Sequence, residues 1–257
     1  LGDYPMFLPG GKEQIAGEYQ PGWMLLSYGK KVSVSSSLEG YPAENIVDED
    51  ARTAWVAQSN RDMEWAQVDL QRLSSIHAIQ VNFDEYGANQ KGAVSGVYQS
   101  YLIYASVNGE DWSLVVDYGT KKTDTPHDYI EFEEPFKARY IKLQNKEYMV
   151  SENFSVRDLR IFGKGQGSTP RAVNDFTVER DEADPCKARL CWEAVPDAQG
   201  YIVRYGIAGD KLYNNFQVMG ENTLEIGSLN KGVAYYFTID AYNENGITRT
   251  SRIKVCR

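Results

Sequence analysis

The sequence lacks a run of about 18 apolar residues, the length that a membrane-spanning helix needs, and it contains only two histidines, His77 and His127. Each histidine stands alone, and a lone histidine in a strand or loop is more typical of packing than of general-base catalysis. Nucleophile elbows, zinc-protease helices and phosphate-binding glycine loops are also missing. The sequence therefore predicts no catalytic site and no membrane insertion.

Basic residues are scarce as well. The net charge is −9, and residues 30–163 contain 14 basic and 21 acidic side chains, so seven of the nine excess negative charges lie there. Nucleic acids and acidic phospholipids are bound by clustered Lys and Arg. We expect no nucleic-acid partner, whereas the negative charge does not exclude neutral ligands.

Cysteine is limited to Cys186, Cys191 and Cys256. An odd count excludes complete pairing. Cys186 and Cys256 would pair if the strands that carry them end at the same pole of a sandwich; otherwise all three thiols are free. The sequence leaves both alternatives open.

Long helical periods are missing, and the chain is rich in Tyr and Gly. Between residues 30 and 163, short β-prone runs alternate with turn clusters, as in a β-sandwich. Val68 and Leu70 share one face of a strand, as do Ile141 and Leu143. Asn108-Gly109 predicts a tight hairpin. The fold class is therefore all-β.

Turn-forming and linker residues divide the chain into four segments, of which residues 30–163 are the predicted first sandwich. Residues 1–29 are turn-rich and read as a lead-in from a missing upstream domain, because the sequence starts at Leu1 without an initiator methionine or secretion signal. Residues 164–170 are small and polar and predict a short linker. Residues 171–257 predict a second, smaller sandwich of seven strands.

Oxygen-bearing side chains crowd the loop 41–55, where Asp48, Asp50 and Thr53 fall within six residues. Such a loop suits a hard cation such as Ca²⁺, which takes about six to eight oxygen ligands. The alternative is that these acidic side chains simply face water. Trp55 follows directly and, like Trp65 and Trp112, is predicted to pack in the core because each follows a recurring strand pattern.

Several motifs in this region occur in a recognisable order. The loop, with Asn45-Ile46-Val47-Asp48 and Thr53-Ala54-Trp55, precedes the segments 65–70, 106–112, 138–143 and 156–163. Together they resemble the discoidin or coagulation factor 5/8 C-type domain, a jelly-roll-like β-sandwich similar to family 32 carbohydrate-binding modules. The resemblance implies a structural Ca²⁺ bound by oxygens of Asn45, Asp48, Asp50, Thr53 and Asp158. The family commonly has Gly and Glu where Glu49 and Asp158 stand here.

The second sandwich and the lead-in carry resemblances of their own. The strand with Trp192, the strand 200–205, and Leu229 followed by Tyr235 resemble a fibronectin type III domain. Residues 1–5 and 22–28 resemble the junction after the catalytic propeller in bacterial family 43 glycoside hydrolases.

Ligand binding in this fold uses loops at one end of the sandwich. Two long loops, residues 84–98 and 147–154, offer aromatic rings for the apolar face of a sugar and polar groups for its hydroxyls. Alternatively, these aromatic side chains pack their own loops. The side chains predicted to bind carbohydrate are Tyr86, Asn89, Gln90, Tyr98, Tyr148, Asn153 and Phe154, with Arg61 from a neighbouring loop.

These expectations combine into one leading hypothesis. The chain is the non-catalytic carbohydrate-binding accessory region of a secreted, periplasmic or cell-surface glycoside hydrolase, and it holds polysaccharide near an upstream catalytic domain. One alternative is a structural module that packs on that domain without binding sugar. Another is a protein or cell-surface adhesion module, which would expose apolar side chains ringed by basic residues.

Overall fold

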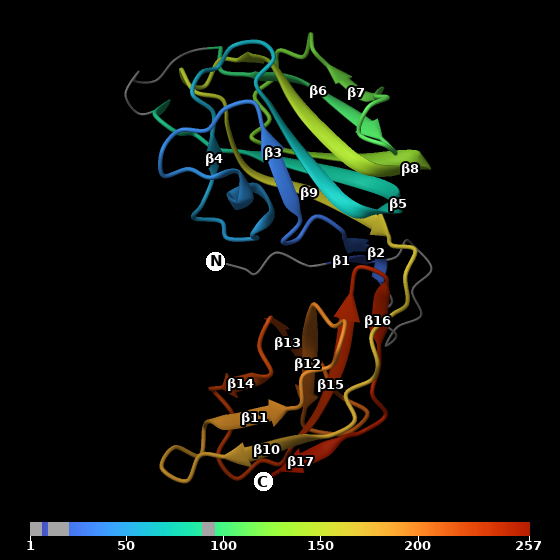
Figure 1. Ribbon diagram of the computed structural model, residues 1–257. Coiled ribbons are helices and arrows are strands. Elements are labelled where there is room, and N and C mark those ends of the chain that lie inside the picture. Colours follow the sequence, from blue (N-terminus) through green and yellow to red (C-terminus); the bar gives the residue numbers. More distant parts are fainter. Residues whose placement is uncertain (1–6, 10–20, 89–95) are drawn as a thin grey trace. The chain divides into compact units, whose positions relative to one another are not determined.

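The computed structural model describes residues 7–9, 21–88 and 96–257 of the chain. Its regular elements are strands and one 3-10 helix, η1 (Ala43–Val47), so the all-β prediction is confirmed. The chain divides into two compact units, residues 1–166 and 167–257 (Figure 1). The division falls inside the segment 164–170.

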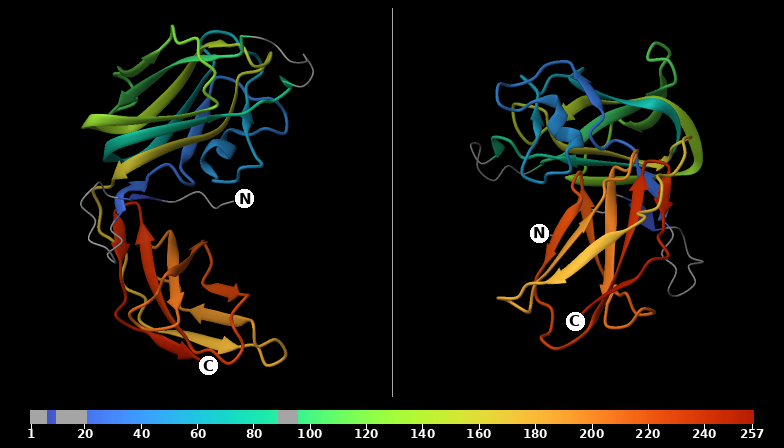
Figure 2. Two further views of the ribbon diagram at one scale, coloured as in Figure 1. Left: turned by 180° about the vertical axis from the view of Figure 1, so that it is seen from behind. Right: turned by 60° about the horizontal axis from the view of Figure 1, so that its bottom comes forward.

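The first unit is one antiparallel sheet with strand order β1-β2-β9-β5-β8-β6-β7, in which β3 pairs with β5 and β4 with β9. The long strands β5 and β8 run side by side through the unit (Figure 2). The strands are β1 (Phe7–Pro9), β2 (Pro21–Leu25), β3 (Lys31–Val34), β4 (Trp55–Val56), β5 (Trp65–Phe83), β6 (Gln99–Ser106), β7 (Ser113–Tyr118), β8 (His127–Tyr148) and β9 (Ser155–Lys164).

Breaks in the register of β5 explain how a single sheet encloses a core. The pairing of β5 with β8 shifts between Asp69 and Ser74 and again between Ile76 and Ala78. Such irregularities bend a strand and increase its twist. Side chains from both halves of β5 therefore reach the same buried cluster, which also contains Trp55 and the predicted core residues Val68, Leu70, Ile141 and Leu143.

The end of the lead-in segment belongs to this unit. Met24 and Leu25 of β2 pair with Gly163 and Phe162 of β9. Leu25 is 1% exposed, and burial of such a side chain contributes about 1.5–3 kcal/mol. A Cβ at Gly163 would lie 2.0 Å from the backbone oxygen of Ser75, so only glycine fits there.

The second unit contains a three-stranded sheet, β10-β11-β14, and a five-stranded sheet, β13-β12-β15-β16 with β17 also on β15. Their buried side chains form one core that includes Trp192, Val203 and Phe237. The strands are β10 (Phe176–Arg180), β11 (Ala188–Trp192), β12 (Gly200–Gly206), β13 (Asn214–Met219), β14 (Thr223–Ile226), β15 (Tyr235–Asn243), β16 (Gly246–Thr248) and β17 (Lys254–Cys256).

This unit has eight strands where the spacing predicted seven. Strands β16 and β17 both pair with β15, on the edge that β12 leaves open, and their registers differ by two residues. Residues 249–253 thus separate two strands that share one edge of β15. In the connection between β14 and β15, the backbone N–H of Asn230 donates to the Tyr235 hydroxyl at 3.2 Å.

All three cysteines are free thiols in the structure. Cys186 is exposed and Cys256 is buried. Burial raises the pKa of the Cys256 thiol, and the adjacent Arg180 guanidinium opposes that rise. The free-thiol alternative is therefore the one that the structure contains.

Candidate functional site

The loop after η1 brings three oxygen atoms together. The Thr53 hydroxyl donates to Asp48 Oδ2 at 2.7 Å and lies 3.0 Å from the backbone oxygen of Asp50. Asp48 Oδ1 accepts from the Asp50 backbone N–H at 2.8 Å. These contacts curl residues 48–53 so that carboxylate, hydroxyl and carbonyl oxygens converge.

Two predicted ligands use their side chains elsewhere. The Asp50 carboxylate accepts from Arg52 through both of its oxygens, and this contact lowers the pKa of Asp50 to about 2. The Asn45 amide donates to the Ala54 backbone oxygen at 2.8 Å. The Asn45 amide nitrogen and both carboxylate oxygens of Asp50 are therefore engaged within the loop, whereas these contacts leave the backbone oxygens of both residues unused.

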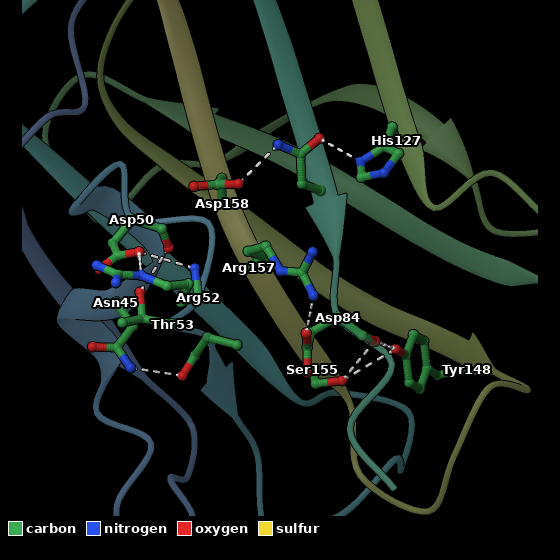
Figure 3. Close-up of polar contacts among 12 residues, drawn as sticks. Asn45, Asp50, Arg52, Thr53, Asp84, His127, Tyr148, Ser155, Arg157 and Asp158 are labelled. Atoms are coloured by element: carbon green, nitrogen blue, oxygen red, sulfur yellow. Dashed lines mark hydrogen bonds and ion pairs between the residues drawn. The ribbon is translucent and has the colours of Figure 1, made fainter. Parts of the chain in front are cut away.

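Asp158 lies on β9 and is 1% exposed. Its Oδ2 accepts from the Asn82 amide at 2.8 Å, and Asn82 Oδ1 lies 3.1 Å from His127 Nδ1 (Figure 3). Its Oδ1 is buried without a hydrogen-bond partner among the described residues. Burial raises the pKa of Asp158, and the Asp48 carboxylate raises it further, so the two carboxylates are close enough to interact.

This donor set fits a hard cation. A buried carboxylate oxygen without a partner is costly unless a positive charge reaches it, and Asp158 Oδ1 is such an atom. The described residues hold no cluster of three or more His, Cys, Asp or Glu side chains. A cation here would therefore depend on hydroxyl and carbonyl oxygens from Thr53, Asp50 and Asn45 as well as on Asp48 and Asp158.

An ion pair also links this loop to β9, and the sequence analysis did not identify its partner on β9, Arg160, as a site residue. Glu49 and Arg160 form an ion pair whose side chains are 5% and 3% exposed. Burial raises the pKa of Glu49 even though Arg160 opposes the rise, while Asp158 and Asp48 reinforce it. Arg160 is thus the group that favours the charged form of Glu49.

Several loops at one end of the first unit are held together by side-chain amides. Asn60 donates to the backbone oxygens of Tyr148 and Ser151. Asn145 donates to the backbone oxygens of Asn60 and Arg61, at 2.8 and 3.0 Å. These loops form one connected platform, whose shape is fixed by the half-buried amide of Asn60 and the buried amide of Asn145.

Two residues predicted to bind sugar lie in the core instead. Tyr148 and Phe154 are each 1% exposed, and their rings pack against each other and against Phe83. The Tyr148 hydroxyl donates to the backbone oxygen of Asp84. These rings cannot stack on a ligand at the surface, so the prediction is corrected for both.

Other predicted residues have structural contacts but stay accessible. The Asn153 amide donates to the Ala57 backbone oxygen at 2.9 Å. The Tyr98 hydroxyl donates to Glu147 at 2.8 Å, and Lys122 lies 5.2 Å from the Tyr98 ring centre. Arg61 is exposed. Asn89 and Gln90 lie outside the described residues.

Tyr86 remains as an aromatic candidate, and it has a neighbour that the sequence analysis missed. Its half-exposed ring meets the ring of Tyr41 edge to face, with 4.9 Å between centres. Two residues before Tyr86, Asp84 pairs with Arg157, and both side chains are partly exposed. The signal for Tyr41 was its place in a Gly-Tyr-Pro turn, where a large ring has little core to enter.

Two tryptophans predicted to be core residues are only half-buried. Trp55 is fully buried, as predicted, whereas Trp65 and Trp112 lie outside the buried cluster. Trp112 covers Lys142, whose Nζ is 4.1 Å from the ring centre. A ring that follows a hairpin packs on the outer face here because the inner face is already filled.

The platform also exposes two methionines. Met63 is 61% exposed at a φ of 83°, and Met149 is 50% exposed. Carboxylates of Asp62 and Glu147 lie on the same loops and pair with Lys146 and Lys122. These apolar side chains are therefore ringed by charges of both signs.

The first unit is thus an all-β domain, with loops joined by side-chain amides at one end and an oxygen-rich loop against β9. Residues 31–158 match the sequence model of the family described as F5/8 type C domain. This segment is therefore an F5/8 type C domain, the class to which the motifs pointed.

Curated relatives match part of the chain. Lactadherin from Rattus norvegicus is 33% identical over 110 residues, which are 40% of this chain and 25% of the relative. Lactadherin from Mus musculus is 32% identical over 110 residues, 40% of this chain and 23% of the relative. The chain spans about a quarter of the length of these relatives.

Solved structures with a similar arrangement include two bacterial modules. One is chitosan-binding module 2 from a Paenibacillus sp. IK-5 chitosanase/glucanase in complex with chitotriose, at TM-score 0.46 and 19% identity, covering 54% of this chain and 99% of that one. The other is the family 32 module of NanJ from C. perfringens in complex with galactose, at TM-score 0.43 and 18% identity, covering 54% and 97%.

No helix among the residues that the structure describes has both the length and the apolar character to cross a membrane.

Proposed function

We propose that residues 31–158 form a carbohydrate-binding module whose ligand lies across the loops that carry Tyr41 and Tyr86. The observation that carries this proposal is the edge-to-face pair of half-exposed rings, in which Tyr86 follows the ion-paired Asp84 by two residues. An aromatic ring accepts the C–H face of a pyranose, and a carboxylate and guanidinium bind its hydroxyl groups. Membership of the F5/8 type C family supports a binding role for these loops.

The wider context belongs to the same proposal. The chain is an accessory region of a secreted glycoside hydrolase with an upstream catalytic domain, and residues 171–257 are a fibronectin type III spacer. The hydrogen bond from Asn230 to the Tyr235 hydroxyl supports the fibronectin type III assignment, since it resembles the tyrosine corner of such sandwiches. In this arrangement the module acts by proximity, because even a weak contact raises the local concentration of substrate.

A structural Ca²⁺ completes the proposal. Asp48, Thr53 and Asp158, with the backbone oxygens of Asn45 and Asp50, would hold it, and the converging oxygens and the unpartnered Asp158 Oδ1 support this set. The ion would neutralise buried carboxylates and link the loop to β9, and it would stabilise the folded form by an amount that rises with the logarithm of the free Ca²⁺ concentration above the Kd.

The experiment is a binding screen of the purified chain against soluble and insoluble polysaccharides, including neutral plant and microbial glycans. We expect at least one neutral polysaccharide to retain the protein, with an affinity in the millimolar to micromolar range typical of a single weak contact. Cleavage of any polysaccharide by the isolated chain, or retention by none, would contradict the proposal.

A second candidate function is adhesion to a membrane or protein surface, and the exposed Met63 and Met149 favour it. Apolar loop residues of this kind insert into an interface when basic residues surround them. The carboxylates on the same loops oppose anionic membranes. Binding to vesicles containing phosphatidylserine, with no retention by any polysaccharide, would favour this candidate over the first.

A further inference from the structure

The contact between Glu49 and Arg160 is a buried ion pair. Arg160 Nε donates to Glu49 Oε1 at 3.0 Å, and a terminal guanidinium nitrogen lies 2.9 Å from Oε2, which has no aligned hydrogen bond among the described residues. Arg160 also donates to Gln80 Oε1 at 3.0 Å and lies 5.1 Å from the Phe162 ring centre. Contacts with β5 and β9 thus hold the guanidinium in place independently of the loop.

The backbone of Glu49 shows that the loop is held in an unfavourable conformation. Its φ is 60°, in the left-handed region where an L residue with a Cβ is strained and glycine is not. The domains that this loop resembles commonly have glycine at this position. A large side chain is tolerated at such a place when its own contacts offset the strain. Among the described residues, Arg160 is the group that donates a hydrogen bond to the Glu49 side chain.

We propose that the Glu49–Arg160 pair holds the loop 43–53 on β9 when no metal ion is bound, so that the loop of this chain does not depend on Ca²⁺ for its fold. Arg160 brings a fixed positive charge to the carboxylates from the strand side. Asp158, two residues before Arg160 on β9, lies close enough to feel that charge. Any bound Ca²⁺ then further stabilises a loop that the ion pair already holds on β9.

Hydrogen exchange tests this directly, because peptides covering residues 43–55 report loop opening and peptides covering β5 report global unfolding. The parent chain and the Arg160→Met variant are compared in EDTA and in 5 mM CaCl₂. We expect exchange in the parent loop to change less than twofold between the two conditions. In Arg160→Met we expect loop exchange at least tenfold faster in EDTA, with Ca²⁺ restoring most of the protection.

Two further variants keep the test decisive. Arg52→Met removes the exposed pair with Asp50 in the same loop, and we expect no more than a twofold change. Glu49→Gln removes the charge of the carboxylate and keeps a side chain of the same size at the same φ, and we expect the same Ca²⁺-dependent protection. Parent exchange that accelerates tenfold in EDTA, or a Glu49→Gln loop as protected as the parent in EDTA, would overturn the proposal.

Discussion

Replacing Trp55 by Ala is expected to lower the unfolding free energy of the first unit by about 3–5 kcal/mol, the range for a large buried aromatic side chain. Trp55 is fully buried, its indole N–H donates to the Ser36 backbone oxygen at 3.0 Å, and its ring packs on Phe154 at 5.8 Å. The variant leaves both a cavity and an unpaired carbonyl. A loss of this size is a large part of the about 5–15 kcal/mol that stabilises a typical domain.

Urea denaturation measures this loss of unfolding free energy, and hydrogen exchange of β5 reports the global unfolding of the first unit separately. Trp112→Ala is the matched control, because Trp112 carries the same ring on the outer face of the sheet. We expect Trp112→Ala to cost less than half as much as Trp55→Ala. Equal losses would show that Trp112 contributes to the core as the sequence first indicated.

Asp158→Asn is expected to stabilise the metal-free protein at pH 7 by about 1 kcal/mol. The variant keeps an oxygen for Asn82 and removes a buried charge. Since the folded-state pKa of Asp158 is raised, the carboxyl favours folding below its unfolded value of about 3.9 and loses that contribution as pH rises through the folded pKa. The advantage of the variant should therefore shrink as pH falls toward 3.

Thermal unfolding in EDTA at several pH values, repeated with Ca²⁺ at pH 7, tests this account. Calcium should raise the stability of the parent more than that of the variant, because the variant has lost a charged ligand. Asp50→Asn serves as the control, since its carboxylate is exposed and paired with Arg52; it should show no gain at pH 7. An Asp158→Asn protein less stable than the parent in EDTA would contradict the account.

The sequence predicted the parts of the fold that local patterns encode. Period-two alternation located Val68 and Leu70 in the core, and they are buried. The order of motifs identified the F5/8 type C segment because each motif is a short local pattern. The break between β16 and β17 was not predictable, because it depends on how β15 is shared between two partners.

The candidate site was harder to predict, because its contacts join residues far apart in the sequence. Tyr148 sits among polar loop residues, yet its hydroxyl reaches Asp84, 64 positions away, and its ring joins the core. Glu49 and Arg160 are 111 positions apart. Period and composition describe neighbours along the chain, so they could identify neither the buried tyrosine nor the buried ion pair.

The central claim is that the loops carrying Tyr41 and Tyr86 bind a saccharide. Isothermal titration with the best polysaccharide from the binding screen tests it most directly, using Tyr86→Ala and the control Tyr213→Ala, which removes a 79% exposed tyrosine from the second unit. We predict an affinity about tenfold weaker for Tyr86→Ala, as expected for loss of a stacking ring, and an unchanged affinity for Tyr213→Ala. Equal affinities for parent and Tyr86→Ala, or loss of binding with Tyr213→Ala alone, would contradict the claim.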